Sequence, residues 1–198
     1  MNRKKLPRSF YLRPTLTVAK DLLGKYLARR VRGKLLIGKI VEAEAYLGEK
    51  DPASHAYRGK TKRNEVMFRK GGHLYVYFTY GMHFCANVVT EKEGVGHAVL
   101  LRALEPIEEI EQMKKNRGFT TDETEYRMLT NGPAKLCKAF GIARDQNGID
   151  LLGNDIFIAI GERISKSKIR QSTRIGIRNG KEKKWRFIIK NNVYVSKR

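Results

Sequence analysis

The sequence predicts an α+β fold, in which one domain is built on a twisted, mainly antiparallel β-sheet with surrounding helices and a protruding β-hairpin. Helical spacing and strand alternation are mixed along the chain, without the regular strand–helix–strand order of a parallel sheet. The length of 198 residues suits a single domain over 1-198. Hydrophobic residues make up 41% and charged residues 31%, which is a globular composition and excludes a disordered chain.

The first half of the chain is expected to supply one helix and most of the sheet. Residues 1-9 are expected to be a flexible basic N-terminus, after which Phe10 and Tyr11 dock onto the body. A helix opens at Pro14-Thr15 and ends at Gly24. Alternation predicts strands over residues 25–32, 35–47, Leu74–Phe84, Ala86–Val89 and Ala98–Leu104, with turns at Gly33-Lys34 and Tyr80-Gly81. The polar loop 48–64 is long enough to suggest a function.

The second half is expected to contain two helices and short strands. The helices are predicted at Glu105–Lys115, with Pro106 in the first turn, and at Ala134–Phe140, between Gly132-Pro133 and Gly141. A flexible polar connection is expected over residues 116–128. Glycines separate three further strands, predicted over residues 155–160, 174–178 and 185–195.

The charge of the chain predicts a polyanionic partner. Lys and Arg number 41 against 20 Asp and Glu, a formal net charge of +21. Nucleic acid is the leading partner, an anionic membrane or ribosomal RNA comes next, and a solvated basic surface is the alternative without a partner. Acidic residues gather in 105–127, whereas residues 163–198 hold 13 Lys or Arg and one acid, Glu182. An acidic back and a basic front are therefore expected.

Cysteine usage and hydropathy indicate the kind of compartment in which the protein folds and whether it spans a membrane. Cys85 and Cys137 are far apart and lie in apolar surroundings, which is typical of free, buried thiols in a reducing compartment. The first residues lack the apolar core of a signal peptide, and no apolar run approaches 18 residues. No membrane-spanning helix is expected.

The run from Ile40 to Gly48 places acids in an apolar strand. Period-two alternation puts Glu42, Glu44 and Tyr46 on one face. Pattern alone favours an outer face with both acids in water. A metal site formed by Glu42, Glu44, Asp51 and His55 is a second interpretation, although no motif such as HExxH supports it. A carboxylate pair across a glycosidic bond is a third, weakened because both acids lie on one strand.

A second run, from Leu74 to Phe84, is rich in aromatic residues. Tyr75, Tyr77 and Thr79 share one strand face, and Val76, Phe78 and Tyr80 share the other. Core packing is the simplest interpretation. The alternative is a hairpin with an apolar tip that wedges into a DNA stack.

Seven segments together resemble a known family. They read E-A-E-A-Y-L-G, A-S-H-A-Y-R-G, R-N-E-V-M-F, L-Y-V-Y-F-T-Y-G-M-H-F-C-A-N, A-V-L-L-R-A-L-E-P, N-G-P-A-K-L-C and R-I-G-I. In this order they closely resemble the alkyladenine (3-methyladenine) DNA glycosylase family, of the mammalian alkyladenine glycosylase type. The resemblance runs from about Phe10 to Ser196.

The resemblance implies a base excision repair enzyme. Such a protein flips an alkylated or deaminated purine (3-methyladenine, 7-methylguanine, hypoxanthine or ethenoadenine) out of duplex DNA and hydrolyses its N-glycosidic bond. It leaves an abasic site without cutting the strand and uses no metal or other cofactor. The implied partner is double-stranded DNA containing damaged purines, bound by a monomer without membrane contact. The implied location is the cytoplasm, associated with the nucleoid, in a bacterium, or the nucleus in a eukaryote.

Three residues match the family's catalytic machinery. Glu44 matches the general base that deprotonates a water and stabilises the oxocarbenium-like transition state. Arg102 and the backbone carbonyl of Ile175 match the groups that hold this water.

Five residues match the family's contacts to the flipped nucleotide and the DNA. Tyr46, His55 and Tyr77 match the base-binding pocket, where aromatic rings attract positively charged alkylpurines. Asn87 matches a residue near the purine 2-position that disfavours the amino group of guanine. Tyr80 matches the residue that intercalates when the hairpin inserts into DNA.

Some parts of the chain depart from the family pattern. His83, beside the hairpin tip, stands where the mammalian proteins have Tyr. Residues 105–127 and 143–172 match poorly and receive no function. Two alternatives stay open at this point: a noncatalytic basic nucleic-acid-binding protein, and a metal-dependent nuclease using Glu42, Glu44 and Asp51.

Overall fold

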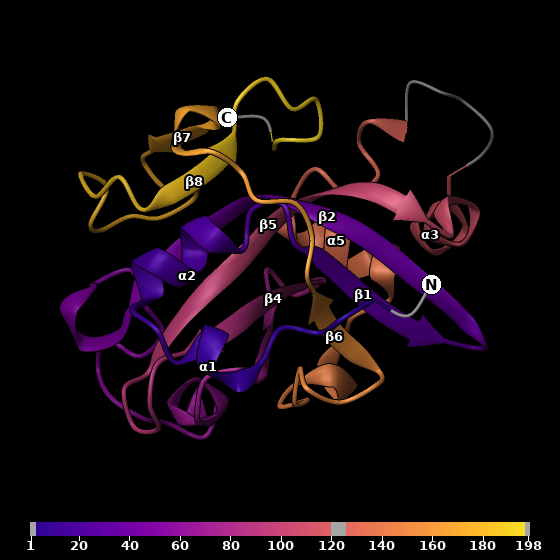
Figure 1. The fold of residues 1–198 in the computed structure, drawn as a ribbon. Coiled ribbons are helices and arrows are strands. Elements are labelled where there is room, and N and C mark those ends of the chain that lie inside the picture. The colour runs from indigo at the N-terminus through magenta and orange to yellow at the C-terminus, as the bar shows by residue number, and fades with distance from the viewer. Residues whose placement is uncertain (1–2, 120–125, 197–198) are drawn as a thin grey trace.

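The fold is one curled antiparallel sheet with a few helices packed around it, as the sequence predicts (Figure 1). The structure, a computed structural model, describes residues 3–119 and 126–196. Within these residues the strand order is β3-β4-β5-β2-β1-β6, and β8 joins β2 with β7 beside it. The strands are β1 Tyr26–Val31, β2 Lys34–Leu47, β3 Leu74–Thr79, β4 His83–Thr90, β5 His97–Glu108, β6 Ile156–Ala159, β7 Ile169–Ser172 and β8 Arg186–Ile189.

The described helices are short, and α1, α2 and α5 begin at a proline or directly after one. They are α1 Arg8–Tyr11, α2 Thr15–Asp21, α3 Ile110–Arg117 and α5 Pro133–Phe140, with single 3₁₀ turns at Gly48–Lys50, Glu65–Phe68, Arg144–Gln146 and Lys166–Lys168. In α5 the proline at the first position suits the helix start, because its missing N–H has no partner to lose there. The helix ends at Gly141, which adopts the left-handed conformation with φ +64°.

The central strand β2 changes face halfway along its length. Its pairing with β5 shifts at Ile40/Glu42, where Val41 is an extra residue, and again at Glu42/Ala43, where β5 supplies the extra residue Arg102. Before the bulge Ile40 faces the main core, and after it Ala43 does so. A one-residue bulge reverses the alternation, so the strand directs Glu42 away from this core.

The two faces of β3, β4 and β5 have different roles. One face contributes Leu74, Val76, Ala86, Val88, Val99 and Leu101 to the main core, which also receives α2 and α5. The opposite face carries Tyr75, Tyr77, Cys85, Asn87, Leu100 and Arg102, which line a cavity. The predicted alternation of Tyr75, Tyr77 and Thr79 is confirmed, and these three residues lie on the cavity face.

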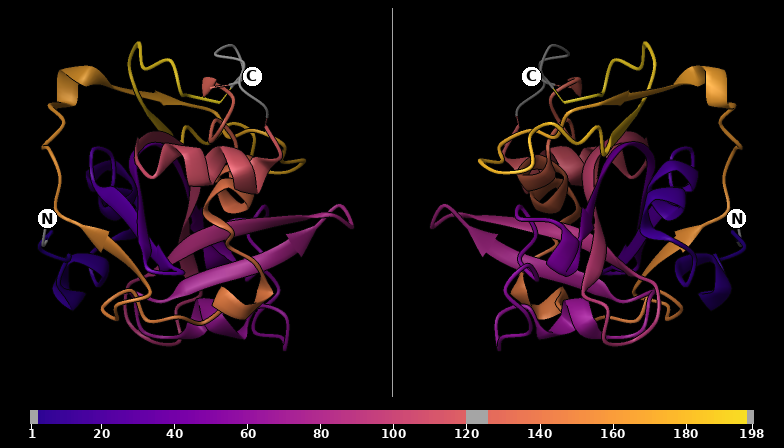
Figure 2. Two further views of the ribbon diagram at one scale, coloured as in Figure 1. Left: turned by 90° about the vertical axis from the view of Figure 1, so that its right-hand side faces the viewer. Right: turned by 90° about the vertical axis from the view of Figure 1, so that its left-hand side faces the viewer.

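The hairpin of β3 and β4 projects from the body of the protein (Figure 2). Its turn runs from Thr79 to Met82, where the Met82 N–H donates to the Thr79 carbonyl at 3.3 Å. Tyr80 and Gly81 both have positive φ, +51° and +68°. Two left-handed residues match the twist of a hairpin, but this conformation is unfavourable for tyrosine.

Several predicted element boundaries are wrong. Residues 105–108 continue β5 as a strand, because they still pair with β2, and the helix begins only at Ile110. The strand predicted over Leu74–Phe84 is divided by a turn at Tyr80-Gly81, which confirms the turn predicted there. The last strand, β8, ends at Ile189 rather than residue 195. Residues 174–178 form a loop, whereas β7 at 169–172 was not predicted. Of the connection predicted over 116–128, residues 120–125 lie outside the described part.

The N-terminal segment contacts the sheet. Leu6 is buried and its N–H donates to the Ile158 carbonyl at 2.8 Å, while Arg3 pairs with Glu108. Tyr11 is fully buried, which confirms that it docks onto the body. Residues 3 onward thus have defined contacts with the body, residues 1–2 lie outside the described range, and the flexibility of residues 1-9 stays a prediction.

The described acids of the expected acidic back are paired with basic side chains. Glu105 pairs with Lys39 at 2.9 Å, Glu109 pairs with Lys34 at 2.9 Å, and Glu108 pairs with Arg3. Residues 120–125 of this segment, with three of its acids, are not described.

Two simpler expectations can also be compared with the structure. Cys85 and Cys137 are both free and buried, as predicted. Among the residues that the structure describes, no helix is both long and apolar enough to cross a membrane.

Replacing Phe140 should test the core. Its ring is fully buried, and it packs so closely on Gly38 that a Cβ there would lie 3.0 Å from the ring. Phe140→Ala is expected to lower the free energy of unfolding by about 3–5 kcal/mol through lost burial and a cavity. Urea denaturation measures it. Phe78→Ala, on the exposed hairpin, is the control and should cost about 1 kcal/mol or less; equal losses would contradict the core assignment.

Candidate functional site

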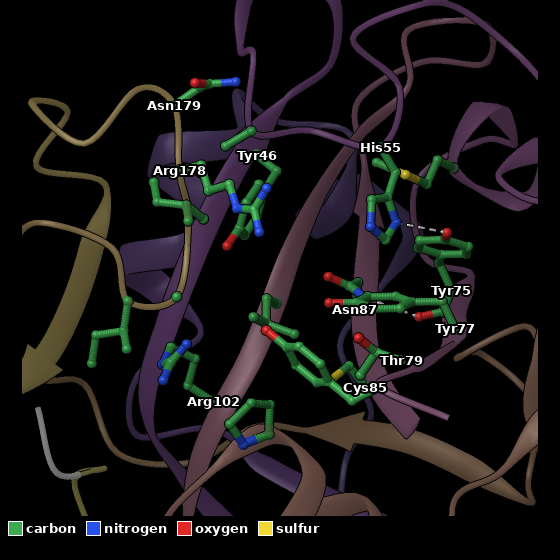
Figure 3. A pocket seen from close by; sticks show the side chains of 18 of the residues that line it. Tyr46, His55, Tyr75, Tyr77, Thr79, Cys85, Asn87, Arg102, Arg178 and Asn179 are labelled. Atoms are coloured by element: carbon green, nitrogen blue, oxygen red, sulfur yellow. Dashed lines mark hydrogen bonds between the residues drawn. The ribbon is translucent and has the colours of Figure 1, made fainter. Parts of the chain in front are cut away.

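A cavity of about 500 Å³ opens on the second face of the sheet. Seven of the eight residues singled out from the sequence line it: Tyr46, His55, Tyr77, Tyr80, Asn87, Arg102 and Ile175. Figure 3 shows Tyr46 and Arg178 on one side and His55 and Tyr77 on the other. The eighth residue, Glu44, lies directly behind this lining, in contact with three of its members. The fold therefore gathers the predicted residues at one place.

Glu44 is a fully buried carboxylate with three hydrogen-bond donors. The Ile175 N–H donates to Oε1 at 2.8 Å, whereas the Tyr46 hydroxyl and Arg102 Nη1 reach Oε2 at 2.9 and 3.4 Å. Burial raises the pKa of Glu44, and the Arg102 charge, the Ile175 amide and the Tyr46 hydroxyl oppose that rise. The interpretation that places the acids in water is wrong, because Glu42 and Glu44 are both fully buried.

Ile175 contacts Glu44 through a different atom from the one predicted to act. The resemblance assigns its carbonyl to a water, whereas the structure shows its N–H donating to the carboxylate. The carbonyl role stays a prediction. No local pattern points to the N–H contact, because 131 residues separate the two positions in the chain.

Glu42 is held by two arginines. Arg102 Nε donates to Glu42 Oε1 at 3.0 Å and Arg186 Nε donates to the same oxygen at 2.6 Å. The N–H and hydroxyl of Ser196 complete the set at 2.7 and 2.8 Å. Glu42 thus fixes Arg102, whose guanidinium also reaches Glu44. The family resemblance assigned no role to Glu42, and the sequence analysis missed Arg186 and Ser196.

The carboxylates of the proposed metal site already have other partners. Asp51 is fully buried and accepts two hydrogen bonds from the Arg174 guanidinium, including one at 2.8 Å to Oδ1. Glu42 and Glu44 share Arg102, and Nδ1 of His55 lies 3.0 Å from the Tyr75 hydroxyl. In the described part of the chain, no three His, Cys, Asp or Glu side chains gather as metal ligands would.

An aromatic wall faces Tyr46 across the cavity. The rings of His55 and Tyr77 meet edge to face, with centroids 4.4 Å apart, and Tyr75 lies 5.6 Å from Tyr77. Burial, and then the neighbouring Cys85, raises the pKa of Tyr77. Burial, and then the charge of Glu44, raises the pKa of Tyr46. Both tyrosines are therefore neutral at pH 7.

Asn87 extends this wall, and His55 and Tyr75 have further features of note. Asn87 lines the cavity and its Nδ2 donates to the Tyr75 carbonyl at 3.2 Å. His55 is exposed on one side at the mouth, and partial burial, followed by the charge of Arg63, lowers its pKa. Tyr75 was not assigned from the sequence, although its place two residues before Tyr77 on the same face is a usable signal.

Tyr80 is the most exposed large apolar residue at the hairpin tip. Its side chain is 81% exposed, and that of Met82, in the same turn, is 70% exposed. Core packing is therefore the wrong interpretation for Tyr80. A tyrosine in an unfavourable left-handed conformation, presented to solvent beside a cavity, is the kind of strain that accompanies functional sites.

Comparisons with known proteins agree on one family. The family model described as "Methylpurine-DNA glycosylase (MPG)" matches residues 9–193. A protein of Carboxydothermus hydrogenoformans is 56% identical over 194 residues, covering 98% of this chain and 99% of its own. Relatives from Francisella tularensis (49% over 187 residues, 93% and 94% covered) and Clostridium acetobutylicum (48% over 200 residues, 97% of each) are also similar. All three carry the name "Putative 3-methyladenine DNA glycosylase".

Substitution of Glu42 should reveal the cost of breaking the buried ionic network. Glu42→Gln leaves Arg102 and Arg186 without their shared charge, so the free energy of unfolding should fall by about 3–5 kcal/mol. Urea denaturation at pH 7 measures this loss. The control, Glu111→Gln, removes an exposed pair with Lys114 and should change stability by less than about 0.5 kcal/mol. A loss for Glu42→Gln as small as the control's would show that the network adds little.

Proposed function

The chain belongs to the methylpurine-DNA glycosylase family and is a DNA-3-methyladenine glycosylase, a DNA repair hydrolase of N-glycosyl bonds, and we propose that Glu44 activates the attacking water. In this proposal the enzyme is of the mammalian alkyladenine type and flips damaged purines into the cavity. The observation that carries it is a buried carboxylate, held by Arg102, Tyr46 and Ile175, immediately behind an aromatic cavity.

Glu44 acts as general base on a water held by Arg102 and the Ile175 carbonyl. The water oxygen attacks the sugar C1′, its proton passes to Glu44, and the purine leaves with the electrons of the glycosidic bond. The carboxylate also stabilises the positive charge that develops on the sugar. Burial raises the pKa of Glu44 toward neutral pH. A raised pKa makes the carboxylate a stronger base.

The enzyme is monofunctional and leaves an abasic site. A glycosylase that also cuts the strand needs an amine to attack C1′, usually a lysine. The side chains that line the cavity, among the described residues, include no lysine. Hydrolysis by water is therefore the only chemistry proposed, and no cofactor is needed.

The base pocket selects flat and often cationic purines. Tyr46, His55 and Tyr77 present rings to the base, and such rings attract the positive charge of 3-methyladenine or 7-methylguanine. The lowered pKa of His55 favours its neutral form, which avoids repelling these bases. Hypoxanthine and ethenoadenine are the neutral substrates that we propose. Asn87 disfavours undamaged guanine through its 2-amino group.

Double-stranded DNA containing damaged purines is the proposed partner. The net charge of +21 gives salt-sensitive binding along undamaged duplex. Flipping a nucleotide costs a few kcal/mol, and Tyr80 offsets this by filling the gap in the stack. The protein acts as a monomer in the cytoplasm, associated with the nucleoid, as suits a bacterial source like that of its relatives; a nuclear location would follow for a eukaryotic one.

Glu44→Gln tests the proposed chemistry. The amide cannot accept the proton, so single-turnover base release should fall by about 10²–10⁴-fold while affinity for lesion DNA stays within about threefold. The assay incubates a duplex containing hypoxanthine or an alkylpurine, then cleaves abasic sites with hot alkali. Glu49→Gln, an exposed acid nearby, is the control. Normal release by Glu44→Gln contradicts its role, and intact DNA with wild-type protein favours a noncatalytic binder.

Tyr80→Ser tests the wedge. Loss of one stacking ring should weaken binding to lesion duplex by about 10–100-fold, and binding to abasic product far less. Binding is measured by fluorescence anisotropy. The Tyr80 substitution is made in the Glu44→Gln variant, so that no base is released during the titration. Met82→Ser, in the same turn and similarly exposed, is the matched control. Equal losses for lesion and product DNA would show that Tyr80 does not stabilise the flipped state.

A further inference from the structure

Arg174 joins the two loops that border the cavity. Nη1 and Nη2 of its guanidinium both donate to the carboxylate of Asp51, which lies in the loop 48–64. Nη1 also donates to the Ala45 carbonyl of β2 at 3.0 Å, and Nη2 reaches the Gly180 carbonyl at 3.4 Å. Arg174 is 5% exposed and Asp51 is fully buried, so water does not screen the pair.

The same guanidinium contacts two aromatic rings. Its carbon lies 4.6 Å from the centre of the Tyr46 ring and 5.2 Å from that of Trp185. Cation–π contacts at this range favour a defined position for the ring. The cation therefore touches the residue whose hydroxyl donates to Glu44.

Two of the three donors on Glu44 lie next to Arg174. Tyr46 contacts it through its ring, and Ile175 is its neighbour along the chain. Residues 174–184 form neither helix nor strand, so no regular pairing fixes the Ile175 amide. The buried ion pair with Asp51 supplies that anchor instead.

We propose that Arg174 and Asp51 are positioning residues for base release, because they hold the Ile175 amide and the Tyr46 hydroxyl against Glu44. The inference rests on the proposed role of Glu44. Neither residue is required to touch the DNA. When the pair is broken, Glu44 loses aligned donors, its direction toward the water changes and burial raises its pKa with less opposition. This effect differs from a general loss of stability.

Asp51→Asn and Arg174→Lys test the proposal against the control Asp150→Asn, which removes the partly exposed Arg8–Asp150 pair. Single-turnover release of hypoxanthine is measured at saturating protein from about pH 5 to pH 9. Asp51→Asn should lower the rate by about 10²-fold with DNA affinity unchanged within about threefold, as expected for misplaced reacting groups. Its rate should also begin to fall at a higher pH on acidification, because the base form of Glu44 then needs a higher pH. Arg174→Lys keeps the charge but loses the paired geometry, so its rate should lie between those of the wild-type protein and Asp51→Asn.

Trp185 supplies a second, local readout. It is the one tryptophan of the sequence and contacts Arg174, so its fluorescence reports whether this loop keeps its place. Acrylamide quenching should increase in Asp51→Asn and Arg174→Lys and stay at the wild-type level in Asp150→Asn. If Asp51→Asn does not fold, Arg174→Lys carries both measurements.

Two results would overturn the inference. One is a wild-type pH profile and wild-type Trp185 quenching in the folded variants. The other is a change in the pH profile and in Trp185 quenching that is equally large in the control variant Asp150→Asn. Failure of the proposed role of Glu44 looks different, because the Glu44→Gln variant would then release base at the wild-type rate.

Discussion

Glu42 and Glu44 extend from one face of β2 into the protein, where neither side chain reaches solvent. A buried carboxylate without partners costs several kcal/mol, so each oxygen must find donors. These donors come from Arg102 on β5, from Arg186 on β8 and from the distant residues Ile175 and Ser196. The hydrogen bonds to these two carboxylates therefore hold the second half of the chain against the first, and the bonded groups form the floor of the cavity.

The placement of this network depends on two backbone irregularities. Val41 is the extra residue in β2 and Arg102 the extra residue in β5, and both lie at the point where the carboxylates begin. Each bulge reverses the alternation of its strand, so apolar residues on both sides of it still reach the main core. The same shift directs Arg102 to the face that carries Glu44. Bulges next to active sites commonly redirect a side chain in this way.

The aromatic residues divide into a rigid wall and an exposed tip. Tyr75 and Tyr77 are held by their strand, by His55 and by burial, which suits a pocket that must present fixed rings. Tyr80 is fixed only by its turn and is open to solvent. A rigid pocket and a projecting tip answer two separate physical needs of base flipping, namely holding the flipped base and filling the space that it leaves.

The sequence alone determined the elements that local pattern controls. Alternation placed Tyr75, Tyr77 and Thr79 on one face, and Gly141 ended the helix that begins at Pro133. Its resemblance to a family named the residues that the fold then gathers around one cavity. The predictions were wrong for residues 105–108, where pairing with β2 overrides a helical pattern. They were also wrong for residues 174–178, which belong to no strand among the described residues. Local pattern contains no information about such distant partners.

Only the tertiary structure decided the environment of the two acids. Period-two alternation correctly grouped Glu42 with Glu44, but an acid in water and an acid paired with buried arginines have the same local pattern. The choice depends on Arg102, Ile175, Arg186 and Ser196, which are between 58 and 154 residues away from the carboxylates they bind. The free energy of a buried charge is set by what surrounds it in space, and sequence spacing does not encode those surroundings.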